Sequence, residues 1–107
     1  MYTYIYPKTF KLAGHTITVR LDKDLMTIED SYGNYSERTG TINLVAPGAI
    51  SKSKIEQTFF HELVHAILDE LGELDLSKNE RFVDSFSTLL HQAICSGEGK
   101  LFPNKKL

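Results

Sequence analysis

The chain has 107 residues, with 12 Lys and Arg against 14 Asp and Glu, one cysteine and a formal net charge of −2. This length suits one small globular domain and leaves no room for a second catalytic domain. The balanced charge argues against a nucleic-acid-binding protein, the lone Cys95 excludes an internal disulfide, and no apolar run reaches membrane-spanning length. The N-terminal sequence MYTYIYPKTF lacks the features of a secretory signal, and we expect a soluble, cytoplasmic protein.

Residues 9–46 show the alternation of apolar and polar residues that predicts half-buried strands. The turn-forming sequences AGH, DKD and YGN interrupt this pattern. The region therefore predicts three or four antiparallel strands. The apolar positions are Phe10, Leu12, Ile17, Val19, Leu21, Met26, Ile28, Ile42 and Leu44.

The alternation ends before residues 51–72. There apolar residues recur every three to four positions, at Phe60, Val64, Ile67 and Leu71, and this spacing predicts a helix. Ser53 and Glu56 have the spacing of a capping box. Gly72 stands where a C-terminal cap is expected.

A second helix is predicted over about residues 78–95, ended by Gly97 and followed by an irregular tail over 96–107. Its predicted apolar face consists of Phe82, Phe86, Leu89, Leu90 and Ala93. Strands followed by a helix pair predict an α+β fold for the single domain 1–107.

The first helix contains His61-Glu62-Leu63-Val64-His65, an H-E-x-x-H pattern. Residues four apart lie on one face of a helix, so both imidazoles can bind one metal ion. At about 100° per residue, Glu62 is expected to point away from the apolar face, where a general base would meet water and substrate. The alternative is a chance match on an amphipathic helix.

A catalytic zinc site usually has a third protein ligand. The metzincin extension is excluded, because Leu68 and Leu71 occupy its Gly and His positions. His15, in a predicted hairpin turn, and His91, near the end of the second helix, are poorly placed to serve as this ligand.

Glu80 and Asp84 fall about 40° apart on the second helix. Glu80 can therefore be the third ligand, and Asp84 can accept a hydrogen bond from a ligand histidine. Two alternatives stay open. Ser77 and Glu80 also form an S-x-x-E capping box, and Asp84 can be a solvated helix residue.

These residues resemble the gluzincin metallopeptidases, which combine H-E-x-x-H with a later N-E-x-x-x-D, here from Asn79 to Asp84. The sequences TFFHELVHAILDELG and ERFVDSFSTLLHQ look most like the small ImmA/IrrE-type metallopeptidases of prophages and mobile elements. The resemblance covers about residues 41–92. It implies a minimal zincin-like core, Zn²⁺ as cofactor, Glu80 as a ligand and a repressor-like regulatory protein as substrate. Members of that family commonly carry a helix-turn-helix or a longer helical region, and neither is expected from this sequence. The gap between His65 and Glu80 is also shorter than in larger gluzincins.

The resulting hypothesis is a zinc endopeptidase in which His61, His65 and Glu80 bind the metal and Glu62 is the general base. An oxyanion donor is also needed, and the candidates are Tyr32, Tyr35 and His91.

Three further residue groups have weaker signals. Thr41–Val45 can be an edge strand that pairs with an extended peptide. Phe59 and Phe60 are expected in the core. Asp69 can orient His65 or can simply be solvated.

Two other functions are compatible with the sequence. One is a zinc-stabilised interaction module without turnover, which would have no use for Glu62. The other is a hydrolase for amide bonds outside proteins. Neither a membrane nor a direct nucleic-acid partner is expected.

Overall fold

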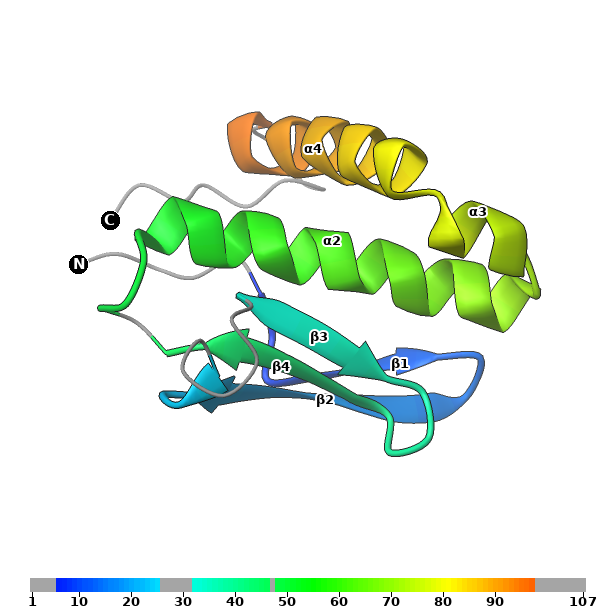
Figure 1. The fold of residues 1–107 in the computed structure, drawn as a ribbon, viewed down its shortest axis with the longest axis horizontal. Helices are drawn as coiled ribbons and strands as arrows, with labels where there is room; N and C mark the ends of the chain where they lie inside the picture. Colours follow the sequence, from blue (N-terminus) through cyan, green and yellow to red (C-terminus); the bar gives the residue numbers. More distant parts are fainter. Residues whose placement is uncertain (1–5, 26–31, 47, 98–107) are drawn as a thin grey trace.

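A computed structural model describes residues 6–25, 32–46 and 48–97 of the chain. The predicted strand residues Met26 and Ile28, together with residues 98–107 of the tail, lie outside this part. The strands are β1 (Thr9–Leu12), β2 (His15–Asp22), β3 (Gly33–Ser36) and β4 (Thr41–Val45), and the helices are α2 (Lys52–Leu71), α3 (Leu74–Lys78) and α4 (Glu80–Ser96) (Figure 1). The predicted α+β class is confirmed.

The four strands form one mixed sheet in the order β1-β2-β4-β3. The pairs β1–β2 and β3–β4 are antiparallel, as predicted, but β2 and β4 run parallel, with Thr18 opposite Thr41. β4 is the most apolar strand, and its Ile42, Leu44 and Val45 are fully buried, so it occupies the centre of the sheet. The polar β3, GNYS, is left at the edge. The prediction that Thr41–Val45 is an edge strand is therefore wrong.

The first hairpin turns through Ala13 and Gly14, which have φ angles of 50° and 82°. Two consecutive positive φ angles are those of a type I′ turn, whose twist matches that of paired strands. The break predicted at AGH is confirmed, and His15 is the first residue of β2.

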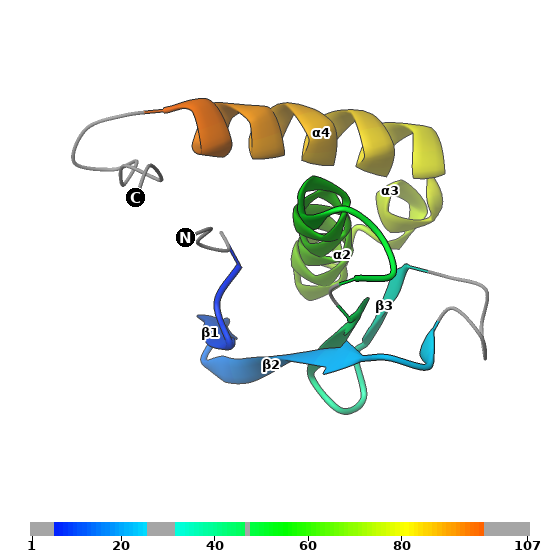
Figure 2. The ribbon, with the colours of Figure 1, turned by 90° about the vertical axis from the view of Figure 1, so that its left-hand side faces the viewer.

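Helix α2 lies between the sheet on one side and α4 on the other, and α4 crosses it rather than lying along it (Figures 1 and 2). The predicted core residues Phe59 and Phe60 pack in a cluster with Ile17, Ile42, Leu44, Val45 and Ile55. A second cluster, of Val64, Leu68 and Val83, joins α2 to α4. Because α2 is covered on two sides, its buried surface is wider than a single apolar stripe.

The ends of α2 differ in part from the prediction. Ser51 is the N-cap, and its side chain accepts from the backbone N–H of Lys54 at 3.3 Å. The capping box of Ser53 and Glu56 is therefore wrong, and Glu56 is buried. The C-cap at Gly72 is confirmed, with φ of 78°.

The buried side of α4 matches the prediction only in part: of the predicted residues, Leu90 packs against the first apolar cluster and Phe82 against the second. Val83, Ser87 and His91 face inward, whereas Phe86 and Leu89 are 49% and 66% exposed. Two of these three inward positions carry polar side chains, which a search for apolar periodicity passes over. The helix begins at Glu80 and is separated by Asn79 from the one-turn helix α3.

Within the described residues, no helix is both long enough and apolar enough to cross a membrane.

Candidate metal centre

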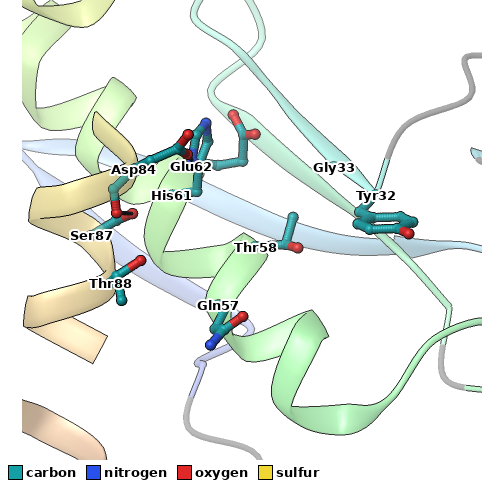
Figure 3. Close-up of a pocket in the computed structure, with 9 residues that line it drawn as sticks. All are labelled: Tyr32, Gly33, Gln57, Thr58, His61, Glu62, Asp84, Ser87 and Thr88. Carbon is teal, nitrogen blue, oxygen red and sulfur yellow. Dashed lines mark hydrogen bonds and ion pairs between the residues drawn. The ribbon is translucent and has the colours of Figure 1, made fainter. Parts of the chain in front are cut away.

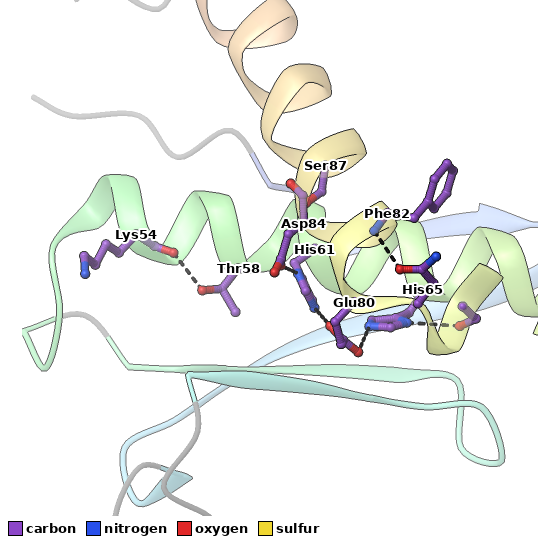
Figure 4. A network of polar contacts seen from close by, with 10 residues as sticks. Lys54, Thr58, His61, His65, Glu80, Phe82, Asp84 and Ser87 are labelled. Atoms are coloured by element: carbon purple, nitrogen blue, oxygen red, sulfur yellow. Dashed lines mark hydrogen bonds and ion pairs between the residues drawn. The ribbon is translucent and has the colours of Figure 1, made fainter. Parts of the chain in front are cut away.

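Three side chains from two helices meet beside the middle of α2 (Figure 4). Glu80 Oε1 lies 3.2 Å from His61 Nε2, and Glu80 Oε2 lies 3.5 Å from His65 Nε2. One carboxylate thus faces the Nε2 atom of each of the two imidazoles. Two imidazole nitrogens and one carboxylate oxygen are a donor set that suits Zn²⁺.

The other nitrogen of each imidazole has its own partner. His61 Nδ1 lies 2.9 Å from Asp84 Oδ1, the contact predicted for Asp84. His65 Nδ1 lies 3.0 Å from Ser77 Oγ. When each Nδ1–H donates to its oxygen partner, the lone pair of each Nε2 points toward Glu80, the arrangement that a metal ligand needs.

Glu80 reaches this position because α4 starts at that residue. The Asn79 side chain caps the helix by accepting from the backbone N–H of Phe82 at 3.1 Å. Val83 packs against Val64 and Leu68 of α2 in the second apolar cluster and so holds the first turn of α4 close to α2. The capping box of Ser77 and Glu80 is therefore wrong, because Asn79 is the cap and Ser77 contacts His65.

Glu62 is 8% exposed, which differs from the expectation that it points away from the core. Helix α2 packs on β3 as well as on α4, so the edge of the sheet covers the side of the helix that was expected to face solvent. Burial raises the pKa of Glu62 from 4.5 to about 7, the charge of Glu80 adds to the rise, and His61 opposes it. A carboxyl group with this pKa can take up and release a proton near neutral pH.

Two open clefts meet at His61, Glu62 and Gly33. The first, of about 280 Å³, extends between the start of β3 and α4 (Figure 3). It is also lined by Tyr32, Gln57, Thr58, Asp84, Ser87 and Thr88. The second, of about 360 Å³, is also lined by Asn34, Tyr35, His65, Asp69 and Glu80. Together they place space for a ligand on both sides of Glu62, next to the edge strand.

The structure separates the three oxyanion candidates. Tyr35 lines the cleft that contains Glu80, and Tyr32 lines the other cleft. The pKa of Tyr35 is raised by burial and then by nearby carboxylates, of which Asp69 acts most strongly, so its hydroxyl keeps its proton at neutral pH. His91 instead lies 3.3 Å from Glu56 Oε1 and lines neither cleft, so its prediction as an oxyanion donor is wrong.

Asp69 lines the second cleft, but the Nδ1 atom of His65 bonds to Ser77. The contact of Ser77 with His65 could not be predicted, because the spacing of Ser77 and Glu80 indicated a capping box. Sequence reasoning also missed Gly33 and Thr58, for which the linear pattern carries no signal. Their place in the site depends on the packing of β3 against α2.

Comparison of the chain with protein-family models, with curated proteins and with solved structures gives no match.

Proposed function

We propose that this protein is a zinc-dependent metallopeptidase that hydrolyses a peptide bond. The observation that carries the proposal is the position of Glu80, whose carboxylate faces the Nε2 atoms of both His61 and His65. The sequence motif alone supplies two ligands, and the third comes from a different helix. The resemblance to gluzincins, described above, supports the same assignment.

The residues fit a catalytic rather than a structural zinc ion. Structural sites are closed by four protein ligands, whereas catalytic sites have three and keep one open position. In the described part of the chain, this group contains three ligands and opens onto two clefts. Glu62, beside them, has no role in a purely structural site.

Zn²⁺ in this site would supply Lewis acidity, which lowers the pKa of a coordinated water and polarises the substrate carbonyl. Glu62 takes the proton from the attacking water and passes it to the leaving amine. Asp84 and Ser77 hold the two imidazoles in orientation through the attack. Tyr35 provides an O–H donor at the cleft that contains the ligands.

The clefts favour an extended peptide as substrate. β3 is the edge of the sheet nearest the site, and its residues Gly33, Asn34 and Tyr35 line the clefts. A chain laid along this edge can pair with the strand backbone, which gives affinity with little demand on sequence. The resemblance to ImmA/IrrE-type peptidases favours a repressor-like regulatory protein, cleaved in the cytoplasm.

The test is to incubate the zinc-loaded protein with an extract of its host cells and to identify new peptide N-termini by mass spectrometry. Glu62→Gln is the inactive comparison, because it keeps the metal ligands and removes the proton acceptor. Glu70→Gln, an exposed residue of the same helix, is the matched control. We expect new termini with the wild type and with Glu70→Gln, and their loss with Glu62→Gln.

The same termini in the Glu62→Gln sample would contradict the proposed mechanism. Zinc binding without new termini, in an extract that contains repressor-like regulatory proteins, would instead favour the interaction module.

A further inference from the structure

A second group of ligand-type side chains lies between α2 and α4. It consists of Glu56, His91 and Cys95, and their donor atoms all lie within 4.8 Å of one another. Glu56 Oε1 is 3.3 Å from His91 Nε2 and 3.8 Å from Cys95 Sγ. From these contacts we infer a second zinc site, in which a carboxylate, an imidazole and a thiolate hold the ion.

The spacing of these residues suits a metal ion. His91 and Cys95 are four residues apart on α4, the same one-turn spacing as the two histidines of the first site. Glu56 comes from the facing helix, so the ligands approach from two directions. Two helices thus contribute to each site, with the roles exchanged: α2 gives the pair in one and α4 gives it in the other.

The distances fit tetrahedral zinc. With bonds of about 2.1 Å to oxygen, 2.0 Å to nitrogen and 2.3 Å to sulfur, oxygen and nitrogen ligands stand about 3.3 Å apart and oxygen and sulfur ligands about 3.6 Å apart. The corresponding separations from Glu56 are 3.3 Å and 3.8 Å. Both separations are close to those of a zinc site, and the donor atoms of His91 and Cys95 lie within 4.8 Å of each other.

Burial and charge favour the ion as well. Glu56 and His91 are 4% and 9% exposed, and the ring of Phe60 lies 5.2 Å from the His91 ring. A buried carboxylate and a thiolate together carry two negative charges, which one Zn²⁺ ion balances. The thiol proton is released to the solvent when the ion binds.

This site is separate from the first. Glu56 precedes His61 by five residues, or about 7.5 Å along the axis of α2, and His91 follows Glu80 by eleven residues, or about 16.5 Å along α4. No ligand is shared. With a water molecule in the fourth position, the second ion would link the later turns of α4 to the start of α2 and so hold the helix that presents Glu80.

The thiolate gives this site a signature of its own. Co²⁺ loaded in place of zinc shows a near-ultraviolet sulfur-to-metal charge-transfer band only when a cysteine binds it, and the first site has none. We expect this band in the wild type and in His61→Ala, and its loss in Cys95→Ser. We also expect the wild type to bind one more equivalent of zinc than Cys95→Ser does, and His91→Ala to bind the second equivalent at least tenfold more weakly than the control His15→Ala does.

The reactivity of Cys95 can be measured in the wild-type protein, so this test does not require a substituted ligand, which can prevent folding. We expect zinc to slow the reaction of Cys95 with a thiol reagent at least tenfold, in the wild type and equally in His61→Ala. An unchanged rate, a missing charge-transfer band in the wild type, or equal zinc stoichiometry in wild type and Cys95→Ser would overturn the second site. None of these results bears on the first site, which His61→Ala tests separately.

Discussion

At the scale of single residues, the candidate metal centre depends on the partners of its two histidines. The positions of His61, Glu62 and His65 could be predicted because their spacing is local to one helix. The sequence allowed Glu80 to be either a metal ligand or part of a capping box, and the fold shows that Asn79 caps α4 instead. The contact between His65 and Ser77 is a tertiary one, and no pattern along the chain indicates it.

Ser77→Ala removes the hydrogen-bond partner of His65 Nδ1. Because such partners fix the orientation of a ligand imidazole, we expect zinc affinity at the first site to fall about tenfold or more. The measurement is a competition titration against a zinc chelator in the Cys95→Ser background, so that the first site is measured alone. The exposed Ser85→Ala is the matched control, and equal affinities for the two variants would contradict the role of Ser77.

The metal-free protein should show the cost of burying Glu62. Its folded pKa of about 7 lies above the ordinary value of 4.5, so its contribution to stability is lost as pH rises through this interval. Glu62→Gln therefore changes stability little at pH 5 and increases it at pH 8, by an amount on the order of 2 kcal/mol. Urea unfolding with a chelator present measures both values, and an equal effect of the substitution at the two pH values would refute the assignment.

At the scale of elements, the strand and helix positions followed from periodicity, but their arrangement did not. Alternation predicts which segments are strands, yet gives no information on which strand is central. The most apolar strand, β4, lies between β2 and β3 and runs parallel to β2, a pairing that the alternation along the chain does not indicate. The inward face of α4 could be predicted only in part, because two of its buried residues, Ser87 and His91, are polar.

Strand β3 lies so close to α2 at Gly33 that adding one methyl group there tests the distance between them. A Cβ atom on Gly33 would lie 2.6 Å from Thr58 Cγ2 and 2.9 Å from the backbone oxygen of Asn43. We expect Gly33→Ala to lower the free energy of unfolding by about 1–3 kcal/mol. Adding Thr58→Ser removes the clashing methyl but not the backbone oxygen, so chemical denaturation should show partial rescue. Unchanged stability in Gly33→Ala would show that the two elements are farther apart.

At the scale of the whole molecule, all four strands lie before residue 46, and the helices after residue 51 carry every proposed metal ligand. The small core is divided into one cluster against the sheet and a smaller one between α2 and α4. The α+β class could be predicted from the order of patterns along the chain. The second ligand group could not, because Glu56 joins His91 and Cys95 only when the helices pack.

Zinc should therefore stabilise the folded chain. A ligand that binds only the folded state at about a thousand times its Kd adds about 4 kcal/mol, which raises Tm by well over 10 °C in a domain of this size. We expect this rise in Cys95→Ser, where the first site remains, and its loss when His61→Ala is added. Calorimetry with and without zinc measures it, and an equal Tm in both conditions would be inconsistent with a metal site.

The most direct measurement is anomalous diffraction at the zinc edge from crystals of the zinc-loaded protein. We expect a zinc peak bonded to His61 Nε2, His65 Nε2 and a Glu80 oxygen at about 2.0–2.2 Å, with Glu62 beside it and unbound. A peak elsewhere only, or one at these histidines with Glu80 turned away to solvent, would contradict it.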